Sequence, residues 1–272
     1  MNNQPCVVIT GSARGFGFEM AKIFKKNGYN VVLSDVNLDN LEKAKLEIES
    51  ISSKGQVISV NCNVTKYSEL ENLWKMAIDS FSRVDICINN AGVNQPDKPI
   101  FELSNKEVDF LLDIDLKGAI YGCKLAFQKM KEQGFGQIYN VEGYGSNDAM
   151  MTGLTLYGTS KRAITYFTQA LAKESKELTN DAVKVCRLTP GIMITDFIKS
   201  ANGGETKIDL PEKTKKVYNI LGDYASTIAE YVVPKMIKNN KNNAKIVWLT
   251  NRKAFARFMT AGFNKRNFFT NC

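Results

Sequence analysis

Tyr157 and Lys161 form a candidate acid/base pair in the segment LYGTSK, residues 156–161. They stand four residues apart where the pattern predicts a helix, so both side chains lie on one helix face. A free tyrosine has a pKa of about 10, and a nearby ammonium group favours its phenolate. The pair could therefore exchange a proton with a substrate. A Tyr and a Lys at this spacing more often belong to a solvated helix face, so the interpretation depends on the motifs around them.

The sequence contains no histidine. This excludes Ser-His-Asp and Cys-His catalysis, metal sites of the His-Glu-x-x-His type, and histidine as a general base. Acid/base chemistry must therefore use Tyr, Lys, Asp, Glu or Cys with a shifted pKa. The six cysteines are scattered and include no Cys-x-x-Cys pair, which predicts reduced, buried thiols and no metal site.

A glycine-rich loop, TGSARGFG at residues 10–17, follows one predicted strand and opens one predicted helix. Gly11 allows a tight turn, Gly15 lets the backbone approach a pyrophosphate, and Gly17 allows close helix–strand packing. The helix N-terminus then presents unpaired N–H groups to the phosphates. This placement predicts a dinucleotide site rather than an ordinary glycine turn.

Asp35 ends the second predicted strand, 18 residues beyond Gly17. A carboxylate at this point can accept hydrogen bonds from the adenosine ribose hydroxyls, and it repels a 2′-phosphate. Arg14 argues the other way, since a cation in the loop could hold that phosphate. We give Asp35 the greater weight because a carboxylate close to a phosphate dianion is costly. NAD is therefore the expected cofactor, ahead of NADP.

Strand-like and helix-like segments alternate from residue 6 to about residue 190. The predicted strands are 6–10, 30–35, 56–61, 85–89, 137–141 and 183–188, with a last one at 244–249. The predicted helices are 15–27, 38–53, 66–81, 104–132, 155–178 and 223–238. Almost wholly apolar strands between amphipathic helices predict an α/β fold, a doubly wound parallel sheet covered on both faces.

No repeat or low-complexity linker divides the chain, so we expect one domain over residues 1–250 and a C-terminal extension over 251–272. Residues 199–222, after the sixth strand, are the least regular. They are either a mobile flap over the site or a plain surface loop.

The composition is that of an ordinary globular protein, with 44% hydrophobic residues and a net charge of +8. No apolar run approaches the roughly 20 residues that span a bilayer. The N-terminal residues show no basic, apolar secretory signal, so we expect a cytoplasmic protein. The lysines are spread along helices rather than gathered in one block, which favours solvated faces and an anionic cofactor over nucleic-acid binding.

The C-terminal extension is basic and aromatic. Phe255, Phe258, Met259 and Phe263 recur at helical spacing in residues 252–269, which also carry five cations and no acid. We expect a helix packed against its own domain. Among functional roles we favour a substrate-side or subunit contact over a weak contact with an anionic membrane surface.

Four motifs in order make the chain similar to one family. They are TGxxxGxG at 10–17, NNAG at 89–92, YxxxK at 157–161 and PG at 190–191 with Thr195. Together they resemble the motif set of short-chain dehydrogenases/reductases over nearly the whole chain. The resemblance implies a Rossmann-type fold with about seven parallel strands and no separate substrate domain. A narrower resemblance, in NVEGYGS at 140–146 and the tail, points to the chlorophyll(ide) b reductase-like branch, from which we infer no substrate.

The resemblance also implies roles in cofactor binding. Asn89, Asn90 and Gly92 would shape the floor of the site, and Ile192 and Thr195 would lie near the nicotinamide amide. Asn63 and Val64 would meet the adenine, with Asn63 replacing the usual Asp. The full expected contact set is Gly11, Ser12, Arg14, Gly15, Phe16, Gly17, Asp35, Asn63, Val64, Asn90, Ala91, Gly92, Tyr157, Lys161, Pro190, Gly191, Ile192 and Thr195.

Two positions depart from the family pattern. The serine that usually follows the strand-end asparagine, here Asn140, by three residues is replaced by Gly143, and we expect Ser146 to substitute for it. The asparagine of the proton relay is replaced by Asp115, which could hold a relay water or pair with Lys161. The expected catalytic set is therefore Tyr157, Lys161, Ser146 and Asp115.

We expect an NAD(H)-dependent oxidoreductase that interconverts a secondary alcohol and a ketone or aldehyde, acting as a homodimer or homotetramer. Apolar residues near the expected pocket hint at a bulky hydrophobic substrate, although they could equally be core; they are Tyr144, Met150, Met151, Met193 and Phe197. Gly143 and Asp115 leave open a catalytically degraded NAD(H)-binding sensor or scaffold, and the tail leaves open a surface-associated protein.

Overall fold

The structure is a computed structural model that describes residues 4–194, 212–263 and 266–269. Its centre is a seven-stranded sheet in the order β3-β2-β1-β4-β5-β6-β9. All neighbouring strands pair in parallel. The strands are β1 (Cys6–Thr10), β2 (Asn30–Asp35), β3 (Val57–Asn61), β4 (Ile86–Asn89), β5 (Gly136–Val141), β6 (Val183–Thr189) and β9 (Lys245–Val247). This confirms the predicted doubly wound α/β fold.

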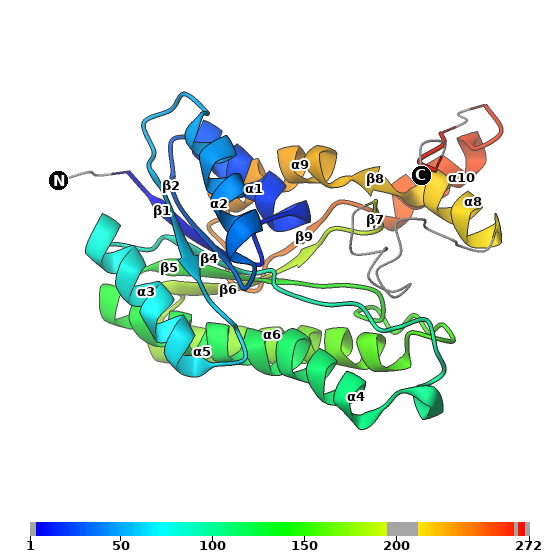
Figure 1. The fold of residues 1–272 in the computed structure, drawn as a ribbon, viewed down its shortest axis with the longest axis horizontal. Helices are drawn as coiled ribbons and strands as arrows, with labels where there is room; N and C mark the ends of the chain where they lie inside the picture. The colour runs from blue at the N-terminus through cyan, green and yellow to red at the C-terminus, as the bar shows by residue number, and fades with distance from the viewer. Residues whose placement is uncertain (1–3, 195–211, 264–265, 270–272) are drawn as a thin grey trace.

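Helices cover both faces of the sheet (Figure 1). On one face lie α1 (Gly15–Lys26), α2 (Leu38–Glu49) and α9 (Ala225–Ile237). On the other lie α3 (Tyr67–Phe81), α4 (Asn105–Leu112), α5 (Ala119–Gln133) and α6 (Thr155–Thr179). Among the described helices, none combines the length and apolarity needed to cross a bilayer.

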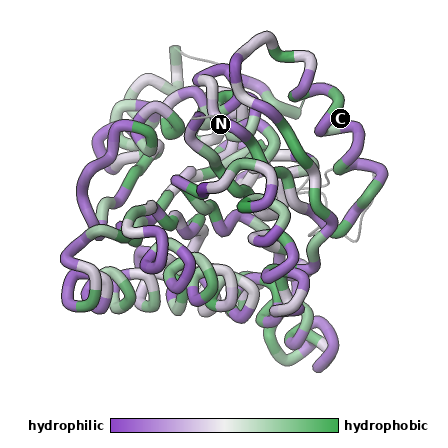
Figure 2. Tube along the Cα trace, turned by 90° about the vertical axis from the view of Figure 1, so that its left-hand side faces the viewer, coloured by the Kyte–Doolittle hydropathy of each residue, from purple (hydrophilic) through white to green (hydrophobic). Residues whose placement is uncertain are grey.

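Two hydrophobic clusters hold these layers together. One joins the sheet to α1, α2 and α9 through residues such as Met20, Ile48 and Val232. The other joins it to α3, α5 and α6 through residues such as Leu73, Ala126 and Ala172. Because parallel strands are covered on both faces, they read as continuous apolar runs rather than alternating ones. The helices instead carry hydrophilic residues on one face and hydrophobic residues on the other, so the two colours alternate along the helices at the lower edge of Figure 2.

The segment predicted as one helix over 104–132 is interrupted. A π-helical turn, η2 (Asp113–Gly118), separates α4 from α5. A π turn adds a residue to the helical repeat and is frequent at functional sites. Here it carries Asp115 into the interior, where the residue is buried although its neighbour Asp113 is half exposed. Periodicity alone does not reveal such an insertion.

The C-terminal ends of the strands meet at the right-hand end of Figure 1. Beyond them lie a short strand pair, β7 (Met193–Ile194) with β8 (Asp223–Tyr224), and the helices α8 (Glu212–Leu221) and α10 (Asn251–Thr260). Part of the predicted flap is therefore helix α8, and residues 199–211 of it lie outside the described residues. In doubly wound folds ligands bind at this edge, where loops follow the strands.

Candidate active site

The glycine-rich loop between β1 and α1 is packed tightly against the loop after β4. Gly11 has φ +62, and a Cβ there would lie 2.7 Å from the Cα of Ala91. A Cβ on Gly17 would lie 2.6 Å from Nδ2 of Asn90, whose amide donates to the carbonyls of Thr10 and Gly11 at 3.0 and 2.8 Å. The structure thus brings the predicted loop and the NNAG motif together, and glycine is required at both contacts.

The N-terminus of α1 is built to receive an anion. Its N-cap residue, Arg14, makes no side-chain capping bond, and no acidic residue occupies the first turn. Gly15 has φ +60, and within the described residues nothing lies within 4 Å of the position where a Cβ would be. Unpaired N–H groups and the helix dipole favour a phosphate at such an end. These features fit the pyrophosphate of a dinucleotide.

Asp35 lies beside this loop. Its Oδ2 accepts from the backbone N–H of Ala13 at 3.3 Å, and Oδ1 accepts from Asn37 N–H at 3.1 Å. A surface hollow of about 330 Å³ is lined by Arg14 and Lys43 as well as Glu47. Asp35 does not line this hollow itself, but Ala13, to which it is hydrogen-bonded, does. The Asp35 carboxylate near the loop would favour a ribose hydroxyl, whereas Arg14 and Lys43 would favour a 2′-phosphate.

Other members of the expected contact set differ in what their side chains do. Ser12 is fully buried and joins β1 to β2, since its hydroxyl donates to Ile9 O at 2.8 Å and accepts from Ser34 N–H at 2.9 Å. Its backbone N–H also donates to the Ser34 carbonyl, at 3.0 Å, so Ser12 serves mainly to hold the loop to β2. Asn63 accepts from Thr65 N–H and hydroxyl at 3.0 and 2.9 Å, which shapes the turn before α3.

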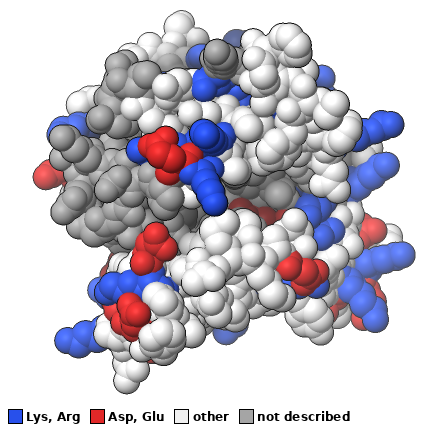
Figure 3. All heavy atoms as spheres, turned by 90° about the vertical axis from the view of Figure 1, so that its right-hand side faces the viewer, with Lys and Arg blue, Asp and Glu red and all other residues white. Residues whose placement is uncertain are grey.

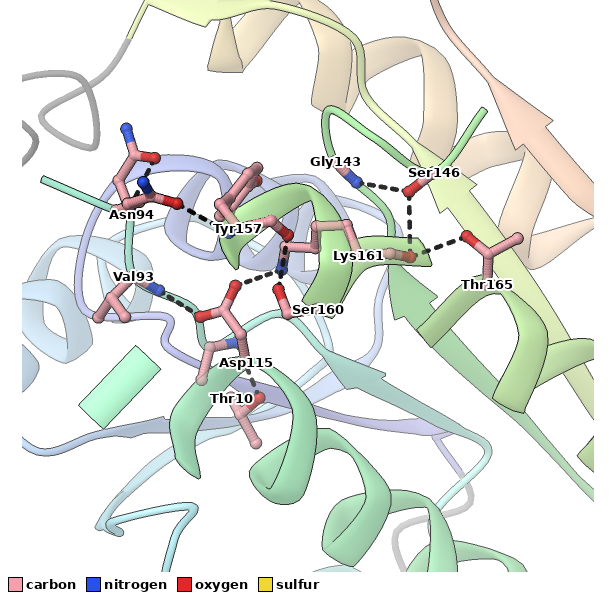
Figure 4. Close-up of polar contacts among 12 residues, drawn as sticks. Thr10, Val93, Asn94, Asp115, Gly143, Ser146, Tyr157, Ser160, Lys161 and Thr165 are labelled. Carbon is pink, nitrogen blue, oxygen red and sulfur yellow. Dashed lines mark hydrogen bonds and ion pairs between the residues drawn. The ribbon is translucent and has the colours of Figure 1, made fainter. Parts of the chain in front are cut away.

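The catalytic candidates converge on the start of α6 (Figure 4). Lys161 Nζ lies 2.8 Å from Oδ2 of Asp115 and 5.3 Å from the centre of the Tyr157 ring. Asp115 Oδ1 accepts from Val93 N–H at 2.7 Å. All three side chains are buried. Of the two roles expected for Asp115, the structure shows the pairing with Lys161.

The electrostatics of this cluster differ from the simple expectation for Tyr157. Burial raises the pKa of Tyr157 to about 12; the Lys161 ammonium lowers it in part, and the Asp115 carboxylate raises it further. Burial by itself lowers the pKa of Lys161, but Asp115 and Tyr157 outweigh burial and leave that pKa raised. Lys161 thus acts on Tyr157 in the expected direction, while Asp115 counteracts it.

The turn after β5 contains the position where the family usually has serine. A Cβ at Gly143 would collide with the Tyr157 hydroxyl and lie 3.0 Å from Cγ of Lys161. Ser146 Oγ accepts from Gly143 N–H at 3.2 Å and donates to the Lys161 carbonyl at 3.3 Å. In Figure 4 this hydroxyl lies on the far side of the Gly143 N–H from Tyr157. A catalytic role for Ser146 requires its hydroxyl to leave that carbonyl.

Two buried residues outside the expected catalytic and cofactor-binding sets position the site. Gln95 Oε1 accepts from the N–H groups of Leu156 and Tyr157 at 2.8 and 3.1 Å, capping the helix that carries the acid/base pair. Glu142 accepts from Thr165 and Thr189 hydroxyls at 3.0 and 2.6 Å and pairs with Lys245 at 3.2 Å. Glu142 thereby joins β5, α6, β6 and β9. An acid in an otherwise apolar strand end was its only signal.

The loop after β6 carries the remaining expected residues. Gly191 has φ +76, and a Cβ there would lie 2.7 Å from Cβ of Leu249. The Ile192 carbonyl accepts from Asp223 N–H at 3.1 Å, which links this loop to β8. Thr195 and Phe197 lie outside the described residues.

The apolar residues proposed for the pocket divide into two groups. Tyr144 packs in a small cluster with Leu103, Leu156 and Tyr157, whereas Met193 packs against the main core. Met150 and Met151 are 91% and 55% exposed and line a hollow of about 400 Å³ with Ile100 and Phe101. In Figure 3, which views this end of the molecule, uncharged atoms surround a group of Lys and Arg side chains with adjoining acids near the upper centre, and further charged side chains lie at the rim. Among the described residues no group of acids and cysteines could hold a metal ion.

A doubly wound parallel sheet, a glycine-rich loop opening a helix, and a buried Tyr–Lys pair at the strand ends define a class: dinucleotide-dependent oxidoreductases with a Rossmann-type fold. The profile of the short chain dehydrogenase family matches residues 5–206. The chain belongs to the short-chain dehydrogenase/reductase family, and is thus an NAD(P)-dependent oxidoreductase acting on CH–OH or carbonyl groups.

Its relatives include reductases of different substrates. Chlorophyll(ide) b reductase NOL from Oryza sativa subsp. japonica is 31% identical over 93% of this chain and 74% of that protein. Diacetyl reductase [(S)-acetoin forming] from Staphylococcus epidermidis is 32% identical over 74% of this chain and 76% of that protein. The first of these confirms the narrower resemblance seen in the sequence.

Solved structures share the fold. A 3-ketoacyl-(acyl-carrier-protein) reductase from Brucella melitensis, complexed with NADH, has a TM-score of 0.75 at 21% identity and covers 92% of this chain and 98% of its own. A metagenomic short-chain oxidoreductase, in complex with NADP, has a TM-score of 0.70 at 19% identity and covers 91% and 97%. The fold thus serves both nicotinamide cofactors.

Proposed function

We propose that the protein reduces a ketone or aldehyde to an alcohol, or catalyses the reverse reaction, with Tyr157 as the acid/base. The observation that carries this proposal is the buried Tyr157–Lys161–Asp115 cluster beside the glycine-rich loop. With a pKa raised to about 12, Tyr157 holds its proton across the physiological range, so the proton that carbonyl reduction needs is present. The experiment is a screen of NADH oxidation against a panel of carbonyl compounds.

Bound NAD(H) would supply or accept the hydride at the substrate carbon. Tyr157 would donate its phenolic proton to the carbonyl oxygen in reduction and take it back in oxidation. Lys161 has one N–H directed at Asp115; the described residues give its ammonium group no second hydrogen-bond acceptor, and its other two donors would reach the ribose hydroxyls. Its charge also stabilises the phenolate left after proton transfer. Gln95 holds the first turn of α6 in place for both residues.

We propose NAD(H) as the preferred cofactor because the Asp35 carboxylate borders the ribose side of the site. Arg14 and Lys43 support the opposite preference, and both line the neighbouring hollow. A carboxylate must be desolvated beside a phosphate dianion, whereas exposed cations contribute weakly at physiological salt. Paired binding titrations with NADH and NADPH test whether Asp35 or the two cations determine the cofactor preference.

For the substrate we propose a bulky hydrophobic alcohol or carbonyl compound. The support is the apolar hollow formed by Met150, Met151, Ile100 and Phe101. Its lining contains no charged side chain. A thermal-shift screen of hydroxysteroids, aryl ketones and short-chain ketones tests the size preference. Stabilisation by only the short-chain compounds would contradict it.

The second candidate is an NAD(H)-binding protein without turnover. Gly143 supports it, because the usual serine is missing and Ser146 donates elsewhere. The intact Tyr157–Lys161 pair opposes it. The candidates separate in one experiment: the sensor would bind NADH and turn over no carbonyl compound.

We further propose a cytoplasmic homodimer or homotetramer. Members of the family typically oligomerise. Light scattering on the purified chain measures its mass.

A further inference from the structure

Helix α10 contacts the rest of the protein through its basic face. Arg257 donates to the Leu221 carbonyl at 2.9 Å and lies 2.7 Å from Oδ2 of Asp223. Lys253, on the same face, lies over the ring of Trp248. Beyond the helix, Arg266 pairs with the other oxygen of Asp223 at 3.0 Å. The described part of the extension is thus anchored to α8 and β8 by cations.

The apolar face of α10 points away from the protein. Phe255, Phe258 and Met259, at helical spacing, are 68%, 50% and 67% exposed, and Phe263 just beyond is 97% exposed. The sequence predicted this stripe and a helix packed against its own domain. The helix does pack against α8 and β8, but its apolar face is turned toward solvent. Asp223 and the carbonyls at the end of α8 attract the cations of α10. The charged face of the helix therefore lies against the protein, and its apolar face lies in the solvent. Water is an unfavourable environment for so many adjacent aromatic side chains.

The charges around this stripe are predominantly positive. Residues 251–269 contain five cations and no acid. Arg252 is exposed next to the apolar face and makes no ion pair with any described residue. Helix α8, against which α10 packs, carries Lys213, Lys215 and Lys216 with Glu212. Two cations on Asp223 leave even that acid overcompensated.

These charges indicate which kind of partner the apolar stripe can bind. A second copy of this chain, placed on the stripe about a two-fold axis, would bring like cations together. An acidic lipid surface would receive the same cations favourably and would bury the aromatic side chains between its headgroups. A helix of ten residues is about 15 Å long and would lie in the plane of the interface.

We propose that the outward face of α10 docks on an anionic lipid surface, with Phe255, Phe258 and Met259 inserted and Arg252 at the headgroups. Because the anchoring cations stay on α8 and β8, docking needs no rearrangement of the domain. It also brings the end of the molecule that carries the candidate active site close to the lipid (Figure 1). The proposal is independent of the proposed reaction.

The test is sedimentation of the full chain with vesicles of phosphatidylcholine alone or mixed with phosphatidylglycerol. We expect binding to the mixed vesicles that weakens with salt. The variant F255S/F258S/M259S should lower it at least about tenfold. Its matched control, Phe110→Ser, removes a 60% exposed phenylalanine on α4 and should leave binding intact. The melting temperature shows that each variant folds.

Three results would overturn the proposal. The chain fails to sediment with phosphatidylglycerol vesicles, or the triple variant binds them as well as the original. In the third, light scattering shows an oligomer that the triple variant alone dissociates, which assigns the stripe to a second copy.

Discussion

Lys161 Nζ and Asp115 Oδ2 are 2.8 Å apart, and the Asp115 side chain is fully buried. The pair links the helix that carries the acid/base residues to the π turn before α5. A neutral asparagine at this position would leave Lys161 as an uncompensated cation beside Tyr157. Asp115 instead offsets part of that charge and adds to burial, the larger cause, in raising the pKa of Tyr157, which favours the protonated form that donates to a carbonyl.

The first prediction follows from this relationship. Asp115→Asn removes a negative charge that raises the pKa of Tyr157. Alcohol oxidation needs the phenolate, so its rate rises with pH toward that pKa. In the variant we expect the rise to begin at lower pH, by about one unit. The pH profile of oxidation with NAD+ measures the shift.

Asp113→Asn is the matched control, because Asp113 lies in the same π turn but is half exposed and pairs with Lys117. Its profile should match that of the unmodified protein. An unchanged or upward midpoint in Asp115→Asn would contradict the role given to Asp115. The melting temperature should fall in Asp115→Asn, because Lys161 loses a buried partner.

Most of the fold could be predicted from the sequence. Apolar runs such as VVLS in β2 are recognisable because a sheet covered on both faces needs no polar positions. The loop at 10–17 predicts where the cofactor binds, since Gly11 and Gly17 are in close contact with Ala91 and Asn90, which are 80 and 73 positions away. A close contact of this kind can be predicted from the sequence because it requires a glycine at that position.

Three features of the structure could not be predicted, because no sequence pattern near them indicates them. Gln95 caps α6 from 61 residues away, and no sequence pattern near residue 156 predicts this contact. The π turn shifts Asp115 inward within a segment whose periodicity still reads as one helix. The apolar stripe of α10 is visible in the sequence, but its outward orientation depends on Asp223, which a distant element supplies.

A second prediction concerns Gly143. Restoring even one methyl group there should damage the site, because the new Cβ would collide with the Tyr157 hydroxyl. We expect Gly143→Ala to lower kcat at least about tenfold. Gly262→Ala, where no described atom is within 4 Å, should change nothing. Full activity in Gly143→Ala would show that Tyr157 works from another position.

Ser146→Ala gives a third prediction. In the structure the only hydroxyl proton of Ser146 goes to the Lys161 carbonyl. We expect a lower melting temperature and a loss in kcat below about tenfold. A donor to the developing negative charge would cost about a hundredfold or more when removed. A loss of that size would restore the assignment of Ser146 as the substitute for the missing serine.

A fourth prediction tests the cofactor. NADH should bind at least about tenfold more tightly than NADPH, a difference of about 1.4 kcal/mol. Asp35→Asn keeps the shape of the side chain and removes its charge, so the preference should shrink. Glu47→Gln removes an exposed carboxylate from the neighbouring hollow, which Asp35 does not line, and serves as the control. A preference of the original protein for NADPH would show that Arg14 and Lys43 outweigh Asp35.

The most direct test of the account is NADH oxidation with a carbonyl panel by the original protein and by Tyr157→Phe. The substitution keeps the ring and removes the proton donor, so turnover should fall at least about a hundredfold. NADH affinity should stay the same. Tyr166→Phe, on the same helix but 75% exposed, should retain full activity. If Tyr157→Phe turns over carbonyl compounds as fast as the original, the proton comes from elsewhere and the account is wrong.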